Sequence, residues 1–308
     1  MKKQRKVDII MSRETVYLSF EAGKPFANSQ YFAYGDYRLH YRIDPAKGAE
    51  KAKMFMLHGF GCDTTFYDEL VEQYVAAGIK CVRVDLPDFG YSTREKKGIN
   101  YVPQIEMLFA LMDELDTDKS GWIIVGHSMG GSVTLQMANQ DASRFNAIIL
   151  NAPLLMANVP DFVGPIMLSK PMTKVLDAAF KFVSPYDWIW KLMTLLMTFN
   201  PIYSLNYDAK KFSTPYMVKD AGTGLCYMTS KTKVPDLKEL HKITCPVQLV
   251  TGQCDLFVFP TKAKQLRNAL PAGYDDHSMK LGGHCFLQDK SKATAKLGLD
   301  FLRKNNVI

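Results

Sequence analysis

The sequence has no apolar run long enough to cross a membrane, since no uncharged stretch approaches the roughly 20 residues that a spanning helix needs. Its six cysteines form no CxxC pair, and several lie in or beside expected core strands, which favours reduced thiols over a disulfide scaffold. It also has no block of like charge: the net charge of +7 is spread along the chain, so nucleic acid is not an expected partner. A composition of 47% hydrophobic and 22% charged residues then indicates a soluble globular protein.

The N-terminal segment begins with basic residues, as a secretory signal peptide does. The apolar stretch that follows is broken at once by Asp8 and ended by Arg13. A signal peptide needs an apolar core of about 7–15 residues between its basic start and its cleavage site. We therefore expect no export signal, which agrees with the cytoplasmic location that the cysteines favour.

Apolar strands alternate with helices along most of the chain. A hairpin around Gly35 and Asp36, over residues 31–43, comes first. The strands that the pattern then predicts are 53–60, 79–87, 121–128, 146–153, 245–252 and 277–283. The helices expected between and after them are 64–78, 103–116, 131–140, 261–271 and 292–305. This order predicts an α/β fold, a mostly parallel sheet flanked by helices on both faces.

The alternation stops at Pro153 and returns near Leu240. The segment between is rich in methionine, aromatic residues and proline, and its residues 186–199 have the length of a helix that is apolar nearly all round. These features predict an inserted helical cap, or lid, over residues 154–240. The core domain would then be built from two parts, residues 1–153 and 241–308.

Ser128 lies in the segment Gly126-His127-Ser128-Met129-Gly130, which matches GxSxG between an expected strand and an expected helix. A sharp turn there holds the serine in a strained backbone conformation, and the two glycines let neighbouring backbone approach closely. The alternative is a tight turn whose serine merely caps the helix. Because a free serine hydroxyl is a poor nucleophile, the catalytic interpretation requires a base and an acid that orients the base.

Two further polar residues follow strands and so reach the same edge of a parallel sheet. Asp255 comes after the strand 245–252, and His284 comes after the strand 277–283. His284 is therefore the candidate base and Asp255 the candidate acid, with a loop histidine and a surface turn as the alternatives. The competing residues 275–277, two aspartates and a histidine, precede the segment SMKL of the last strand, residues 278–281, and are expected at the opposite edge of the sheet.

Ester hydrolysis also needs donors for the developing oxyanion, and on such folds these are backbone N–H groups. The Met129 N–H directly follows the candidate nucleophile, and the Phe60 N–H lies in a glycine-rich loop after a strand. Both positions suit an oxyanion hole. The nearby His58 and His127 are interpreted as structural.

The segments HGFGCD, DLPDFGYS, GHSMGG, GQCDLF and GGHCF, in this order, make the sequence similar to the α/β-hydrolase superfamily, and within it to serine hydrolases of the monoacylglycerol-lipase and carboxylesterase type. The resemblance covers residues 31–304. It implies the α/β-hydrolase fold, with Ser128 as nucleophile, Asp255 as acid, His284 as base, Phe60 and Met129 as oxyanion donors, and no cofactor or metal. Asp88 departs from the pattern, because relatives usually have glycine at that place in the turn.

These residues predict a carboxylic ester hydrolase that acts through an acyl-enzyme, and the apolar cap favours apolar acyl substrates such as monoacylglycerols. The serine nucleophile argues against epoxide hydrolases and haloalkane dehalogenases, which use an aspartate there. A thioesterase or carbon–carbon bond hydrolase on the same triad, a peptidase, and a low-turnover ligand-binding protein remain alternatives. The expected partner is a small ester or lipid. Basic charge and an apolar cap also permit transient contact with a membrane surface, and the sequence defines no oligomeric state.

Overall fold

The computed structural model describes residues 24–155, 162–231, 233–258 and 260–308. The N-terminal segment interpreted above and a short part of the expected cap lie outside the described residues. The centre is an eight-stranded sheet in the order β1-β2-β4-β3-β5-β6-β7-β8. Its strands are β1 (Ser29–Tyr34), β2 (Tyr37–Asp44), β3 (Ala52–Leu57), β4 (Ile79–Val84), β5 (Trp122–His127), β6 (Phe145–Asn151), β7 (Val247–Gly252) and β8 (Asp275–Met279).

The pairing of the strands confirms the mostly parallel sheet. Strands β1 and β2 form the predicted antiparallel hairpin, with Tyr34 opposite Tyr37, and β2 also runs antiparallel to β4. The remaining neighbours, from β4 through β8, are parallel. Every residue of β5 is buried, which is the expected condition for a central strand that is covered on both faces.

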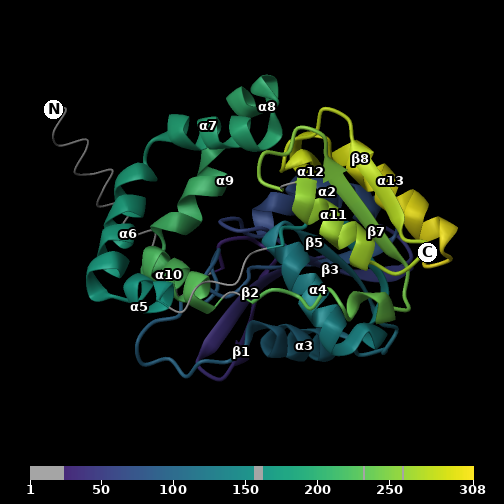
Figure 1. Cartoon of the computed structure of the whole chain (residues 1–308), viewed down its shortest axis with the longest axis horizontal. Coiled ribbons are helices and arrows are strands. Elements are labelled where there is room, and N and C mark those ends of the chain that lie inside the picture. Colours follow the sequence, from purple (N-terminus) through teal and green to yellow (C-terminus); the bar gives the residue numbers. More distant parts are fainter. Residues whose placement is uncertain (1–23, 156–161, 232, 259) are drawn as a thin grey trace.

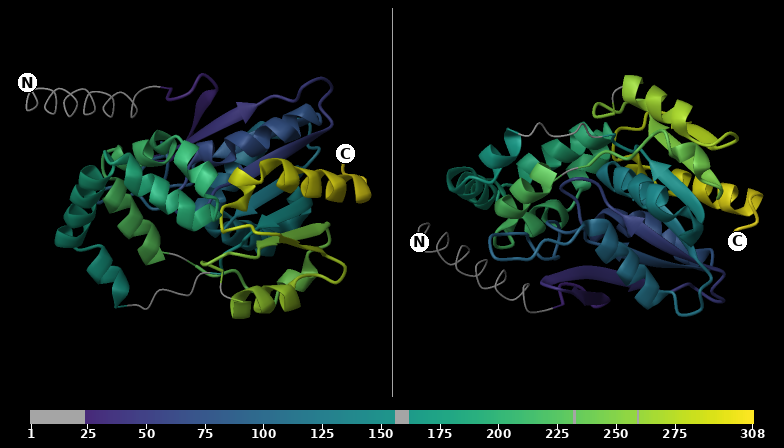
Figure 2. Two further views of the ribbon diagram at one scale, coloured as in Figure 1. Left: turned by 90° about the horizontal axis from the view of Figure 1, so that it is seen from above. Right: turned by 60° about the horizontal axis from the view of Figure 1, so that its bottom comes forward.

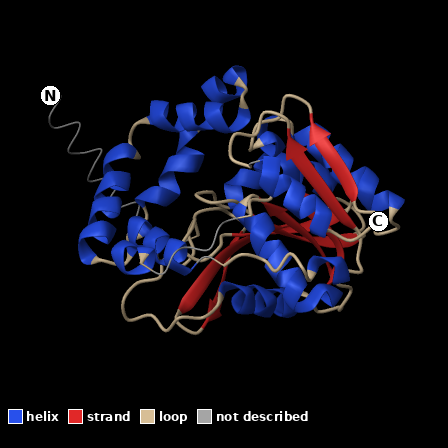
Figure 3. Cartoon of the chain, in the orientation of Figure 1, coloured by secondary structure: helices blue, strands red, loops and turns tan. Residues whose placement is uncertain are grey.

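Helices cover both faces of the sheet (Figure 3). Buried side chains of α3, α4 and α11 join one hydrophobic cluster, and those of α2, α12 and α13 join the other. The helices of these two layers are α2 (Asp68–Ala76), α3 (Gln104–Leu115), α4 (Met129–Asp141), α11 (Pro260–Ala269), α12 (Phe286–Asp289) and α13 (Ser291–Lys304). Short 3₁₀ turns are η1 (Thr64–Tyr67), η2 (Ala142–Arg144), η3 (Thr214–Met217) and η4 (Leu240–Lys242).

A group of helices between β6 and β7 lies to one side of the sheet (Figures 1 and 2). They are α5 (Val163–Met167), α6 (Lys170–Val183), α7 (Asp187–Thr198), α8 (Pro201–Asn206), α9 (Ala209–Ser213) and α10 (Ala221–Lys231). We call this group the cap helices. The end of α7 meets the loop after β8, where the Cys285 N–H donates to the Met197 carbonyl at 2.9 Å. Whether the cap is a domain bounded at residues 154 and 240 stays a prediction.

The last strand begins earlier than the sequence suggests. Residues 275–277 form the first part of β8, paired with β7, so the expectation that they precede the strand is wrong. They do lie at its amino end, which is the expected edge of the sheet, opposite the carboxyl ends of the strands. The start of the strand was missed because residues 275–277 are polar. An edge strand is less buried than a central one, so its sequence need not be apolar. Asp275 and His277 contact each other, with His277 Nε2 2.7 Å from the Asp275 carboxylate.

No helix among the described residues is long and apolar enough to span a bilayer. All six cysteines are free thiols. The cytoplasmic location stays a prediction.

Candidate active site

Ser128 occupies a sharp turn between β5 and α4. Its φ of +53° and ψ of −118° lie outside the regions that residues with side chains ordinarily adopt. The turn is held by the Ser128 N–H, which donates to the Asn151 carbonyl at 3.1 Å. It also requires Gly130, where a Cβ would stand 2.1 Å from the Leu57 carbonyl oxygen. The GxSxG segment therefore forms a strained elbow rather than an ordinary helix cap.

His284 and Asp255 meet Ser128 at the carboxyl edge of the sheet. The His284 Nε2 lies 2.8 Å from the Ser128 Oγ, and its Nδ1 lies 2.8 Å from the Asp255 Oδ2. The His284 and Asp255 side chains are 7% and 5% exposed, and Ser128 is 3% exposed. The structure thus brings together the three residues that the sequence proposed as nucleophile, base and acid.

The Asp255 carboxylate is oriented by its own loop. Its Oδ1 accepts hydrogen bonds from the N–H groups of Phe257 and Val258, at 2.8 and 3.0 Å. Burial acts to raise the pKa of Asp255, but the His284 hydrogen bond and charge outweigh it, so the pKa lies below its usual value. Asp255 is therefore ionised at neutral pH. An ionised carboxylate can only accept, so the Nδ1 of His284 carries a proton, and when the ring is neutral its Nε2 faces the serine as the acceptor.

Two other histidines stand beside this group in structural positions. The His127 Nε2 donates to the His284 carbonyl oxygen at 3.0 Å, which holds the backbone of the base in place. Burial holds the pKa of His127 well below its usual value, so this ring is neutral. The Nε2 of His58 accepts from the Leu86 N–H at 3.0 Å. Both rings thus hold loops, in agreement with their structural interpretation.

The proposed oxyanion donors lie on either side of the elbow. Met129 begins α4, and the first N–H groups of a helix have no acceptor within it. Phe60 follows Gly59 in the loop after β3, and a Cβ on Gly59 would stand 3.0 Å from the Ser128 Cβ. The loop that carries the Phe60 N–H therefore rests directly against the serine. The Phe60 side chain is 44% exposed and contacts Phe89 edge-on, with ring centroids 5.7 Å apart.

Sequence reasoning missed Arg94, which fixes the loop beside the site. Arg94 is buried and donates to the carbonyl oxygens of Phe89, Gly90 and Ser92 at 2.5–2.7 Å. It also donates to the Pro215 carbonyl among the cap helices at 3.2 Å. No motif signals this role, because every acceptor is a backbone group.

Asp88, the departure from the usual turn glycine, adopts a φ of +73°. Glycine enters this region with the least strain, which is a physical reason for the glycine that the family resemblance leads one to expect there. Asp88 is 6% exposed, and its carboxylate accepts the Glu95 N–H at 2.5 Å. Burial raises the pKa of Asp88 to about 7 even though this hydrogen bond and Arg94 act to lower it.

Asp88→Asn is expected to stabilise the protein above about pH 7 by up to ~4 kcal/mol, with no gain near pH 4. The pKa of Asp88 is higher in the folded than in the unfolded chain, so the wild type loses stability as pH rises from the unfolded to the folded value. Asparagine keeps the acceptor for the Glu95 N–H and tolerates a positive φ. Urea unfolding of both proteins at about pH 4, 6 and 8 measures the difference. If the two proteins differed in free energy of unfolding by the same amount at all three pH values, the raised pKa of Asp88 would be contradicted.

Comparison of the sequence with known protein families identifies one family. The family described as serine aminopeptidase S33 matches residues 48–291. The chain belongs to this S33 family. It is 21% identical over 294 residues to a monoacylglycerol lipase of Xenopus laevis, covering 89% of this chain and 81% of that protein. It is 24% identical over 254 residues to a monoglyceride lipase of Rattus norvegicus, covering 79% and 77% of the two chains.

A solved structure shares the fold of this S33-family chain. It is an α/β-hydrolase enzyme from a Medee basin deep-sea metagenome library, with a TM-score of 0.68 and 20% identity over 89% of this chain and 97% of that one. The family and the fold confirm the α/β-hydrolase resemblance, and the protein is a serine hydrolase of the esterase and lipase type. The described residues contain no cluster of three or more His, Cys, Asp or Glu side chains that could hold a metal ion.

Proposed function

We propose that this S33-family protein hydrolyses carboxylic esters of apolar acids, such as monoacylglycerols, through an acyl-enzyme on Ser128. The observation that supports this most directly is the unbroken chain of two hydrogen bonds from the Ser128 hydroxyl through His284 to Asp255. Such a chain gives an otherwise weak nucleophile a base and gives that base a fixed tautomer.

In the first half of the reaction, His284 Nε2 takes the hydroxyl proton while Ser128 Oγ forms a bond to the ester carbonyl carbon. The carbonyl oxygen becomes an oxyanion that accepts hydrogen bonds from the Phe60 and Met129 N–H groups. Asp255 stabilises the imidazolium that forms. The bond between the carbonyl carbon and the alcohol oxygen then breaks, and the alcohol leaves with the proton from His284.

In the second half, water repeats the same steps on the acyl-enzyme. His284 takes a proton from the water as its oxygen attacks the carbonyl carbon, and the same two N–H groups hold the oxyanion. The bond to Ser128 Oγ breaks, and the serine recovers its proton from His284. The acid is released, and the enzyme returns to its starting state without a cofactor.

The preference for apolar acyl groups rests on the cap helices. Helix α7 exposes Trp188, Leu192 and Leu196 at a spacing that places them on one side of the helix. The C-terminal end of α7, next to Leu196, contacts the His284 loop through the Met197 carbonyl. Each methylene of an acyl chain buried against such side chains contributes about 0.8 kcal/mol at most. The names of the two lipase relatives agree with this substrate class.

A substrate panel tests the proposal. The wild-type protein is offered monoacylglycerols, p-nitrophenyl esters of increasing acyl length, acyl thioesters, a carbon–carbon bond substrate and an aminoacyl p-nitroanilide. We expect the highest kcat/KM on esters, with a rise from acetyl to octanoyl. A higher kcat/KM on thioesters, on carbon–carbon bonds or on the anilide would assign the same site to one of the alternatives. Absence of turnover on all of them would favour a ligand-binding role.

Transient membrane contact through the cap helices is a further part of the proposal. Helix α6 exposes Val175 and Phe182, and Lys170 and Lys174 are also exposed on it. Exposed apolar side chains flanked by lysine suit the surface of an anionic bilayer. We expect the protein to float with vesicles that contain phosphatidylserine and less with neutral vesicles.

A double substitution, Val175→Ser with Phe182→Ser, should then reduce flotation several-fold, because the buried apolar area falls. The matched control is Leu281→Ser, an equally exposed apolar residue in the loop after β8. Equal flotation of all three proteins, or none by the wild type, would refute the membrane surface on α6.

A further inference from the structure

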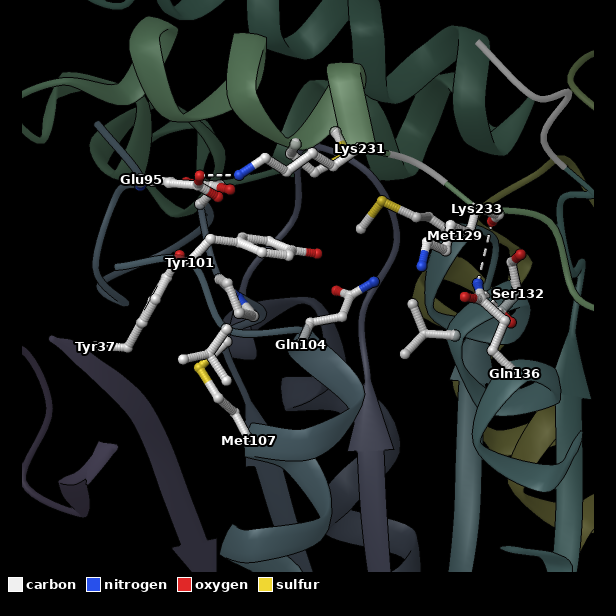
Figure 4. A pocket seen from close by; sticks show the side chains of 15 residues that line it. Tyr37, Glu95, Tyr101, Gln104, Met107, Met129, Ser132, Gln136, Lys231 and Lys233 are labelled. Carbon is white, nitrogen blue, oxygen red and sulfur yellow. Dashed lines mark hydrogen bonds and ion pairs between the residues drawn. The ribbon is translucent and has the colours of Figure 1, made fainter. Parts of the chain in front are cut away.

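A crevice separate from the Ser128–His284–Asp255 group lies between the first turns of α3 and α4 (Figure 4). The loop from β4 to α3 forms one wall, and the end of α10 covers the top. Its volume is about 60 Å³. Because a cavity needs about 10–15 Å³ for each water molecule, the crevice has room for roughly four to six groups of that size.

One wall of the crevice carries an ion pair and an aromatic ring. The Lys231 ammonium contacts the Glu95 carboxylate, and Glu95 is 5% exposed. The same ammonium lies 3.7 Å from the centroid of the Tyr101 ring. Figure 4 shows Lys231 reaching across the top of the crevice to Glu95, with Tyr101 below it.

Two uncharged polar side chains of the crevice have unused hydrogen-bonding capacity. Ser132 is 2% exposed, and its hydroxyl has no partner among the described residues. Leaving such a buried group unpaired is unfavourable, so it indicates a missing partner. The Gln104 amide is directed toward the middle of the crevice in Figure 4. Met129 and Val133 of α4 line the other side and make it apolar.

The charges around the crevice are of both signs. Its lining includes the ammonium groups of Lys231 and Lys233, the Glu95 carboxylate, and Asp88, which is only partly ionised at neutral pH because burial raises its pKa to about 7. An ionic ligand of either sign would therefore meet a like charge, and it would compete with the existing Lys231–Glu95 pair. Hydroxyl groups both donate and accept, so they can pair with Glu95, Lys231, an amide and a serine hydroxyl at once. The carbon atoms of such a ligand can rest on Tyr101 and Met129.

We propose that this crevice is a binding site for a small neutral polyol of the size of glycerol, held by Glu95, Lys231, Gln104 and Ser132. The six non-hydrogen atoms of glycerol match the space for roughly four to six water-sized groups. The site does not depend on the proposed hydrolysis. It does adjoin the hydrolytic site, because the side chain of Met129 lines the crevice while its backbone follows Ser128.

The proposal is tested by titrating the full chain with glycerol and measuring binding at each concentration by saturation-transfer difference NMR. The wild type and Ser128→Ala should bind glycerol equally and saturably, which separates this site from the reactive serine. Gln104→Leu and Ser132→Ala should each weaken the glycerol Kd about 5-fold, the usual effect of losing one hydrogen bond. Gln73→Leu is the matched control on α2, which covers the other face of the sheet, and it should bind as the wild type does.

The ligand 1,2-dimethoxyethane distinguishes recognition of hydroxyl groups from simple filling of the crevice. It has six non-hydrogen atoms, as glycerol has, but donates no hydrogen bond, so it should bind more weakly than glycerol. Circular dichroism confirms that each variant is folded. The proposal fails if glycerol binding does not saturate, if the crevice variants bind glycerol as tightly as Gln73→Leu does, or if 1,2-dimethoxyethane binds equally well.

Discussion

Ser128→Ala is expected to lower kcat/KM for ester hydrolysis by about 10⁴- to 10⁶-fold and to abolish covalent labelling by a fluorophosphonate. The Ser128 Oγ is the atom that His284 Nε2 contacts at 2.8 Å, and alanine offers no atom that can form the acyl bond. The folded state should survive, because a smaller side chain fits the elbow, although its φ of +53° remains strained. Kinetics on a p-nitrophenyl ester and gel detection of the labelled protein measure the two effects.

The control for this variant is Ser143→Ala, at an exposed serine beyond the far end of α4. It should keep both the activity and the labelling of the wild type. His284→Ala should lose activity to a similar degree, and the double variant with Ser128→Ala should be little worse than either single variant, because the two residues act as one unit. Persistent labelling of Ser128→Ala would show that the reactive serine lies elsewhere.

The three residues of the candidate site could be located from sequence because each follows a strand of the parallel sheet. The apolar runs before Ser128 and Asp255 predicted β5 and β7. Because neighbouring strands here are parallel, the loops that follow them lie at the same edge of the sheet. The strain at Ser128 was also readable, since the glycines two positions before and after it are required by close backbone contacts. Local patterns of this kind carry information because the backbone itself forms the site.

Other features depend on contacts that no local pattern encodes. The start of β8 was misplaced because an edge strand with Asp275 and His277 has little apolar signal. A helix as uniformly apolar as α7 does not reveal from sequence which of its sides faces the core. The polyol crevice joins Gln104, Ser132 and Lys231 from three separate segments, so it becomes visible only when the fold is known.

Asp255→Asn is expected to reduce kcat by about 10³- to 10⁴-fold while leaving the protein folded. The asparagine oxygen can still accept the N–H groups of Phe257 and Val258, so the loop keeps its shape. Its amide nitrogen can then donate to His284 Nδ1, which would move the ring proton to Nε2. A protonated Nε2 faces the Ser128 hydroxyl as a donor and cannot take its proton. The imidazolium would also lose the negative charge that stabilises it.

Asp275→Asn is the matched control, because it removes an equivalent carboxylate that hydrogen bonds a histidine in the neighbouring strand. Asp275 contacts His277 at 2.7 Å and accepts from Gln248 at 3.0 Å, and neither contact reaches Ser128. We expect kcat within about 2-fold of the wild type, since exposed or half-exposed polar pairs contribute little. A larger loss in Asp275→Asn than in Asp255→Asn would move the acid to β8. The pair of variants therefore decides whether the aspartate in the loop after β7 or the one at the start of β8 orients the catalytic base.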